Sequence, residues 1–293
     1  MLKKMVVGAI APLCLLGMAD MASAGEFNPY LPAPGSGSVD YNYIHQNSRV
    51  IREDIGGKTR YRFWDELSQN SQLLSATYGV TDKFAINARL GYAETDMKYI
   101  GDTVITGKSG FSDTLIGVRY RLADEFANAP LTVTVGASGI IRGLYSPTAI
   151  DSIGEQSSGA QLGVSIGKWV TPKFALTGEL GGRLRFAKVP EELFVSVSAS
   201  YSFSDRVHGW VSMTHADSLG GIDILGPGFV SVGPPEDFNY NFQEVEEDTN
   251  VADIGGSIRI WKGMAVTGSY GRRFLGRNTL QGGFFRIGLS YNF

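Results

Sequence analysis

The chain has 293 residues, a formal net charge of −3, 19% charged residues and 43% hydrophobic residues. This composition is too apolar for a disordered chain, and a mean hydropathy of −0.03 is too low for a helical membrane protein. The slight acidic excess gives no support to nucleic-acid binding, so we expect no nucleic-acid partner.

The first predicted element is an export signal. Two lysines open the chain, residues 5–18 are an apolar run, and Ala22-Ser23-Ala24 matches a small-residue cleavage site. The run is shorter than the about 20 apolar residues that a membrane-spanning helix needs. We therefore expect residues 1–24 to be a cleaved signal peptide, and residues 25–36, with three prolines, to be an extended periplasmic lead-in.

The single cysteine, Cys14, lies inside the apolar run of this signal. Leu13 precedes it where a lipoprotein signal would have a small residue, so we reject lipid attachment there. The mature chain then has no cysteine, which excludes disulfides, thiolate metal sites and a cysteine nucleophile.

Beyond the signal, the dominant hydrophobic period is two. The last segment alternates Phe285, Ile287, Leu289, Tyr291 and Phe293 with Arg286, Gly288, Ser290 and Asn292. A strand with one apolar face and one small or polar face is typical of a transmembrane barrel. The same alternation predicts twelve strands, near residues 37–45, 69–80, 84–95, 112–122, 131–142, 159–170, 174–185, 192–203, 207–215, 251–261, 264–273 and 283–293.

The connections between these strands alternate in length. Tight turns at 81–83, 171–173, 204–206 and 262–263, and a connection at 124–130, alternate with long polar stretches at 46–67, 97–110, 144–157 and 217–250. Outer-membrane barrels have short periplasmic turns, long external loops and an even number of strands, so we expect both termini to be periplasmic. A soluble β-sandwich, the alternative, would leave Gly, Ser and Arg as its whole surface.

We therefore predict an all-β fold, a transmembrane antiparallel up-and-down β-barrel over residues 37–293, in the outer membrane of a Gram-negative bacterium. Its first expected partner is outer-membrane lipid. The terminal Tyr291-Asn292-Phe293 resembles the end signal of outer-membrane proteins, which implies recognition by the barrel-assembly machinery.

The polar faces of the strands would line the lumen of this barrel. Two readings of their charges stay open, a charged pore that filters solutes and internal ion pairs that clamp neighbouring strands. With twelve strands, a narrow pore and a plugged lumen are both compatible with the barrel size. The lumen-lining candidates are Arg89, Asp113, Arg119, Arg121, Arg142, Glu179, Arg183, Arg185, Asp253, Arg259 and Arg286.

The stretch 217–250 holds eight acidic residues and no Lys or Arg. Carboxylates suit hard cations such as Ca²⁺, but the spacing matches no EF-hand loop, so we predict no metal site. We expect instead a solvated loop that partly folds over the pore. Four aromatic residues would then form a constriction: Phe229, Phe238, Tyr240 and Phe242.

Enzymatic catalysis needs a set of catalytic side chains, such as a nucleophile with a general base, and the sequence does not offer one. His208 and His215 lie too far apart on one predicted strand to share a metal. Ser212 and His215 come nearest to the nucleophile and base of a hydrolase. The local motif of outer-membrane phospholipases is absent, however. No phosphate-binding glycine loop occurs either, so we predict a protein that is not an enzyme and has no cofactor.

Several segments resemble one known family. These are Gly110–Leu122 (GFSDTLIGVRYRL), the proline-started strand Pro130–Gly136, Tyr41-Asn42-Tyr43 and Gly167–Phe174. Together they are similar to the outer-membrane family named for the meta-pathway of phenol degradation, over nearly the whole mature chain. Ile141-Arg142-Gly143 stands where that family often has Pro-Thr-Gly. The resemblance implies a transporter or channel for hydrophobic or aromatic compounds, and it supplies no catalytic residues.

The sequence thus favours an outer-membrane channel that lets a small solute pass through a narrow, arginine-lined lumen. The rival interpretation is a plugged barrel with a structural or adhesin-like role, whose loops bind a surface partner.

Overall fold

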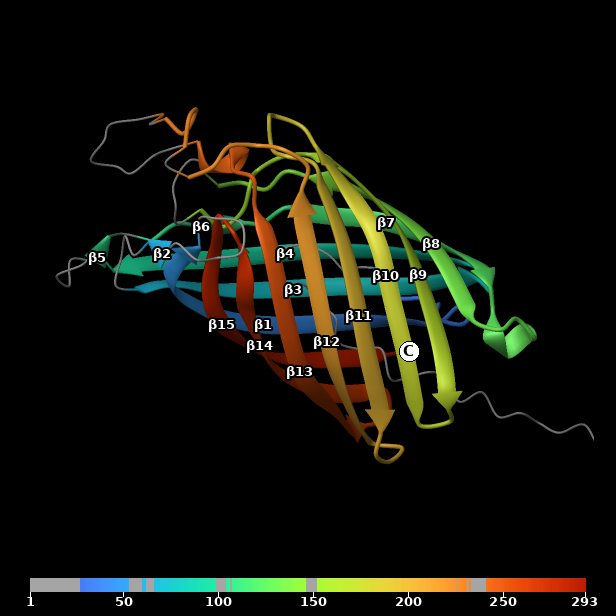
Figure 1. Ribbon diagram of the computed structural model, residues 1–293. Coiled ribbons are helices and arrows are strands. Elements are labelled where there is room, and N and C mark those ends of the chain that lie inside the picture. Colours follow the sequence, from blue (N-terminus) through green and yellow to red (C-terminus); the bar gives the residue numbers. More distant parts are fainter. Residues whose placement is uncertain are drawn as a thin grey trace, which may run out of the picture.

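The computed structural model describes residues 27–52, 60–61, 66–98, 104–105, 107–145, 152–224, 226–230, 232 and 241–293. The described chain forms a closed antiparallel β-barrel in which each barrel strand pairs with the next one along the chain (Figure 1). The last strand returns to the first, and their pairing runs from Ser38↔Asn292 to Arg52↔Thr279. The predicted signal peptide, residues 1–24, lies outside the described residues.

Twelve strands make the wall, which confirms the predicted number and order. They are β1 (Gly37–Arg52), β3 (Glu66–Thr81), β4 (Phe84–Lys98), β7 (Thr114–Ala123), β8 (Thr132–Ile141), β9 (Gly159–Thr171), β10 (Phe174–Arg185), β11 (Glu192–Ser202), β12 (Val207–Ser218), β13 (Asp248–Trp261), β14 (Met264–Arg277) and β15 (Thr279–Asn292). Three short strands add to β1 and β4 at one end: β2 (Arg60–Tyr61), β5 (Val104–Ile105) and β6 (Ser109–Phe111).

The predicted bounds are correct for β10 and too short for several strands on the opposite side of the barrel. β1 runs to Arg52 rather than to residue 45, and β14 and β15 almost meet at Asn278. The reason is visible in Gln46-Asn47-Ser48 of β1, where both faces of the strand are polar. Hydrophobic alternation therefore ends before the hydrogen-bonded ladder does.

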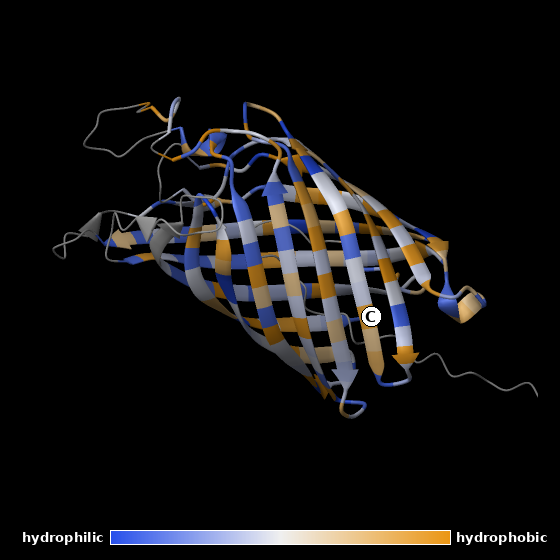
Figure 2. Cartoon of the chain, viewed as in Figure 1, coloured by the Kyte–Doolittle hydropathy of each residue, from blue (hydrophilic) through white to orange (hydrophobic). Residues whose placement is uncertain are grey.

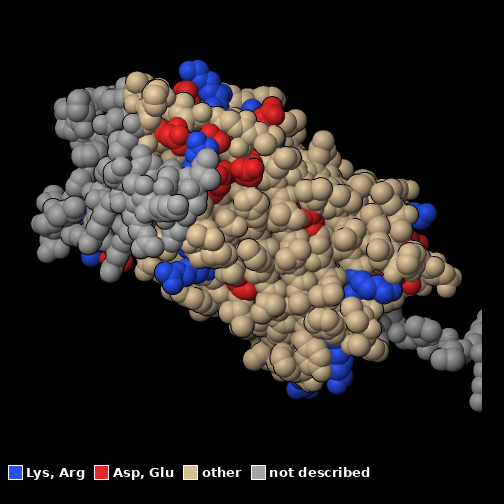
Figure 3. All heavy atoms as spheres, viewed as in Figure 1, with Lys and Arg blue, Asp and Glu red and all other residues tan. Residues whose placement is uncertain are grey.

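The wall is apolar outside and polar inside. Ile116, Val197 and Ile287 are each more than half exposed on the outer surface. On the inner surface, Thr132, Thr134, Gln161 and Ser165 are fully buried. Hydrophobic and hydrophilic positions alternate along each strand in Figure 2, and charged side chains gather mainly at the two ends in Figure 3. This distribution is that of a lipid-facing barrel.

The two ends of the barrel differ as the sequence predicts. At one end, which we call the short-turn end, tight turns connect the strands. An example is Lys262-Gly263, where the glycine has a left-handed φ of +80°. The opposite end, which we call the loop end, carries the long connections. Among the described residues, no helix is long and apolar enough to cross a membrane.

Candidate functional site

The lumen is the candidate site, and its wall carries small polar side chains and arginines. Ser196, Ser257 and Thr267 are among the small side chains buried there. Removing charged groups from water is costly unless each one finds partners, so the partners of the arginines show how the lumen is built. Four arginines of the described strands are 5–8% exposed: Arg119, Arg183, Arg273 and Arg286.

The predicted lead-in does not extend away from the barrel. Residues 27–36, which we call the N-terminal segment, enter the short-turn end. Phe27, Tyr30 and Leu31 are at most 6% exposed there, whereas residues 33–35 are exposed. The main chain of the segment accepts hydrogen bonds from wall side chains. Arg119 donates to Asn28 O at 3.2 Å, Thr134 to Pro29 O at 2.6 Å and Arg121 to Leu31 O at 3.3 Å.

Two carboxylates of the barrel complete this set of contacts. Glu179 accepts a hydrogen bond from Phe27 N at 3.3 Å, and Glu125 accepts one from the Tyr30 hydroxyl at 2.8 Å. Arg121 also pairs with Asp124. The sequence missed this role because proline-rich residues look like a linker when their partners lie about 100 residues away.

Inward-facing glycines make room for the segment. A Cβ atom at Gly136 would lie 2.0 Å from the Phe27 ring, one at Gly163 2.5 Å from it, and one at Gly167 2.8 Å from Tyr30. These glycines sit on the neighbouring strands β8 and β9, where Gly136 pairs with Gly163. They form a shallow seat for two aromatic rings. This seat was not predicted from the sequence, although glycine in a strand can mark a close approach of this kind.

Gly136→Ala should therefore displace the N-terminal segment. Overpacking typically costs about 1–3 kcal/mol, which raises the displaced population by a factor of about 5 to 150. Chymotrypsin, which can cleave after Phe27 and Tyr30, should then cut the folded barrel faster by that factor. Gly139→Ala is the matched control, because a Cβ there lies 3.9 Å from its nearest neighbour and points outward. Equal cleavage rates for the two variants would contradict the claim that these glycines seat the N-terminal segment.

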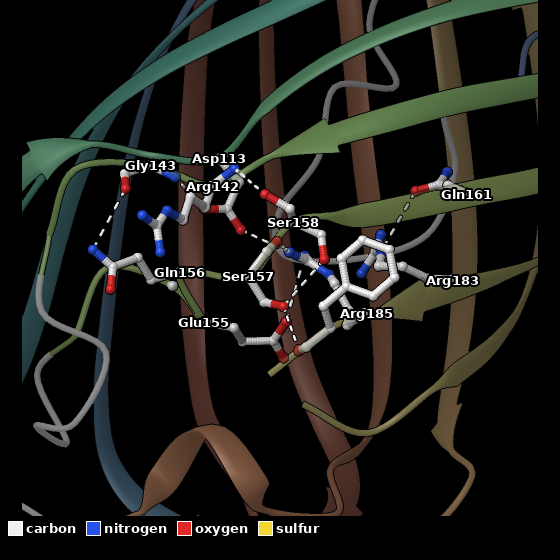
Figure 4. Close-up of polar contacts among 12 residues, drawn as sticks. Asp113, Arg142, Gly143, Glu155, Gln156, Ser157, Ser158, Gln161, Arg183 and Arg185 are labelled. Carbon is white, nitrogen blue, oxygen red and sulfur yellow. Dashed lines mark hydrogen bonds and ion pairs between the residues drawn. The ribbon is translucent and has the colours of Figure 1, made fainter. Parts of the chain in front are cut away.

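A charged cluster at the loop end joins the connection between β8 and β9 to the wall (Figure 4). Asp113 accepts hydrogen bonds from Arg185 at 2.7 Å, from the Tyr145 hydroxyl at 2.9 Å and from Gly143 N at 2.8 Å. Arg185 also donates to Ser157 O at 2.8 Å and lies 3.4 Å from Glu155. Burial raises the pKa of Glu155, and the charge of Arg185 opposes this effect.

The cluster continues along the wall through two further arginines. Arg183 donates to Gln161 at 3.2 Å and pairs with Glu192 at 3.0 Å. Arg89 on β4 interacts electrostatically with Arg183, Arg185 and Asp113. Of the two readings of the lumen charges, these contacts favour internal ion pairing at the loop end.

The acidic loop between β12 and β13 is anchored to the hairpin end of β14 and β15. Asp223 accepts hydrogen bonds from Arg277 at 2.8 and 2.9 Å and from Asn278 at 3.0 Å. The Arg277 hydrogen bonds hold the pKa of Asp223 below its usual value. Arg277 also pairs with Glu246, so this loop uses its acidic residues as tethers.

The same loop folds inward with two of the predicted aromatics. Phe229 and Phe242 meet edge to face at 5.1 Å and pack against Ile224 and the lumen-facing Leu67 and Met97. A nearby cavity of about 30 Å³ has room for one or two waters. Phe238 and Tyr240 lie outside the described residues.

The remaining predicted residues are distributed around the wall. Asp253 accepts a hydrogen bond from Trp210 Nε1 at 2.8 Å and interacts with the buried Arg286. Arg259 interacts with His208 near the short-turn end. Arg142 lies just beyond β8 with an exposed side chain, so it is not part of the packed cluster.

The described residues offer little for catalysis. Ser212 and His215 lie three residues apart on β12 and therefore face opposite sides of the wall. No group of three or more His, Cys, Asp or Glu side chains within the described ranges could hold a metal ion.

No protein-family model and no curated protein matches the chain, so sequence comparison does not confirm the phenol-pathway family. Among solved structures, an outer membrane channel from Pseudomonas putida F1 has a TM-score of 0.69 at 14% identity and covers 92% of this chain and 100% of that one. The translocator domain of the autotransporter NalP from Neisseria meningitidis has a TM-score of 0.49 at 15% identity, covering 89% and 90%. The KdgM porin in complex with disordered oligogalacturonate reaches 0.49 at 10%, covering 87% and 99%. The first likeness shows the fold of an outer-membrane barrel.

Proposed function

We propose that this protein is an outer-membrane channel for small solutes, and that the N-terminal segment closes it at rest from the periplasmic side. The observation that carries the proposal is how residues 27–36 are held. Their main chain accepts bonds from Arg119, Arg121 and Thr134 and joins no strand ladder until Gly37. Hydrogen bonds of this kind contribute about 0.5–3 kcal/mol each, so the segment can leave while the barrel stays intact.

The seat of the segment supports small aromatic compounds as the solute class. Phe27 lies over Gly136 and Gly163, and Tyr30 lies 6.4 Å from the ring of Trp169. A seat that fits aromatic rings of the chain will fit a planar solute ring when it is vacated. Arg119 and Arg121 would then face the solute, which favours aromatic compounds that carry a negative charge.

The inward-folded acidic loop is a second constriction in this account. Phe229 and Phe242 rest on Leu67 and Met97 inside the loop end, where a solute would enter. The rival function, a plugged structural or surface-binding barrel, is favoured by the ion pairs of Asp113 and Arg185 at the same end. The two functions differ in whether any solute crosses the membrane through the barrel.

Solute flux into liposomes separates them. The refolded mature barrel is tested with acetate, benzoate, a neutral monocyclic aromatic and a monosaccharide. We expect benzoate to enter faster than acetate and the sugar, and deletion of 222–246 to raise the flux of all four. Arg119→Gln should reduce the preference for benzoate over the neutral aromatic. No flux of any solute through a folded barrel or its loop deletion would leave the plugged barrel as the better account.

A further inference from the structure

The ladder between β14 and β15 ends before the strands do. Their pairing stops at Arg273↔Gly282. Above this point β14 continues along β13 as far as Arg277↔Asp248, and β15 continues along β1 as far as Thr279↔Arg52. Residues 274–281 therefore form an arch in the wall at the loop end.

A pocket of about 540 Å³ lies on the outer face below this arch. Alternation turns Tyr270, Arg272 and Phe285 outward, and the adjacent Gly282 and Gly283 leave space between them. A Cβ at Gly283 would lie 2.9 Å from the Tyr270 hydroxyl, so any larger residue there would enter the pocket. From β1, the His45 ring packs against Phe285, with ring centroids 5.2 Å apart and the planes tilted by 36°.

The height of the pocket places it at the edge of the apolar band. Phe285 lies eight residues from the end of the chain at the short-turn end, and Arg272 lies eight from the start of β14. Eight residues rise about 26 Å along a strand, or about 20 Å along the axis of a tilted barrel. An apolar band is about 25 Å tall, so the pocket opens where acyl chains meet headgroups.

The lining suits an amphiphile at that boundary. Tyr270 is 57% and Phe285 43% exposed, and they form an apolar floor. Arg272 supplies an exposed cation at the upper edge, and in the described part of the chain no acidic side chain forms an ion pair with it. A cation next to an apolar floor complements a phosphorylated lipid headgroup.

The pocket is a surface site rather than a side entrance to the lumen. The small cavity of about 30 Å³ on the inner side shares five lining residues with it, namely Asn47, Ser48, Gly282, Gly283 and Phe284. That inner cavity has room for only one or two waters, so an acyl chain cannot pass through it into the lumen. A ligand in the outer pocket therefore stays in the membrane.

We propose that this pocket binds a phosphorylated lipid of the outer leaflet, with its phosphate on Arg272 and an acyl chain over Tyr270 and Phe285. The proposal rests on the membrane orientation of the proposed function, with the loop end outside. It assigns the channel a fixed lipid contact on the β14–β15–β1 face.

The test measures lipid retention by native mass spectrometry of the refolded mature barrel, titrated with lipid A, with dephosphorylated lipid A and with inorganic phosphate. We expect one tightly held lipid A and about tenfold weaker retention after dephosphorylation, a difference of about 1.4 kcal/mol. Arg272→Gln should remove that preference, and Gly283→Val should weaken both lipids by filling the pocket. Arg206→Gln, an exposed arginine at the short-turn end, should change nothing.

Three results would overturn the proposal. They are equal retention of the two lipids, an unchanged preference in Arg272→Gln, and displacement of lipid A by an equal concentration of inorganic phosphate. Retention does not depend on conduction. A barrel that conducts but does not retain lipid contradicts this inference alone. A barrel that retains lipid but does not conduct contradicts only the proposed channel function.

Discussion

Deleting residues 27–34 is expected to raise the single-channel conductance of the refolded barrel roughly tenfold or more, because it removes the aromatic rings that fill the short-turn end. The deletion ends before Gly35, whose amide bonds Gly79 O at 2.8 Å, so the start of β1 keeps its anchor. Arg119, Arg121 and Thr134 lose the main-chain oxygens that they bond and should bind water instead.

The conductance change should come with anion selectivity. With the segment removed, Arg119 and Arg121 line the open passage, so the reversal potential in a salt gradient should move toward that of chloride. Gly139→Ala, an outward change on β8, serves as the matched control and should conduct like the unaltered barrel. A deleted barrel that stays as closed as the complete one would show that another element limits conduction.

Asp113→Asn is expected to lower the free energy of unfolding by about 3 kcal/mol, as removal of one partner from a buried ion pair typically does. The side chains of Asp113 and Arg185 are 12% and 10% exposed. Without the carboxylate, Arg89, Arg183 and Arg185 face one another with less negative charge between them. Urea unfolding in lipid vesicles, followed by tryptophan fluorescence, measures the loss.

A double variant shows whether the loss of stability in Asp113→Asn comes from the unpaired charge of Arg185 or from lost packing. Asp113→Asn with Arg185→Gln should recover part of the stability, because the second change removes the uncompensated guanidinium. Asp205→Asn, in an exposed turn, should stay within about 0.5 kcal/mol of the unaltered barrel. If Asp113→Asn is as stable as this control, the cluster does not hold the loop end together.

The barrel was predictable because one physical constraint repeats in every strand. Lipid outside and a lumen inside impose a period of two, which segments such as Phe174–Arg185 show from end to end. The inward positions of Arg119, Glu179 and Arg183 follow from the same alternation. Strand ends beyond the apolar band, as in β1 above Gln46, have no such signal and were predicted too short.

The contacts that hold the N-terminal segment and the loops were not predictable, since they join segments that are distant in the sequence. Nothing in Phe27–Pro34 reveals that its partners are Thr134 and Glu179, more than 100 residues away. Tyr145 and Asp113 meet only because a loop folds inward. The paired glycines at 136 and 163 carry information about the seat, but a glycine in a strand has several uses.

A reversible tether tests the central claim, that the N-terminal segment closes the channel. A Cβ at Gly136 would lie 3.0 Å from Phe27 Cγ, so the two Cβ positions are at most about 4.5 Å apart, within reach of a disulfide. The predicted mature chain has no cysteine, so Phe27→Cys with Gly136→Cys makes a single possible bond. Single-channel current is recorded before and after a reductant is added. We predict a closed barrel when the bond is intact. When it is reduced, conductance should exceed that of the unaltered barrel, because the variant lacks the Phe27 ring that seats the segment. Equal conductance in the two states, with the bond verified by mass spectrometry, would contradict the claim.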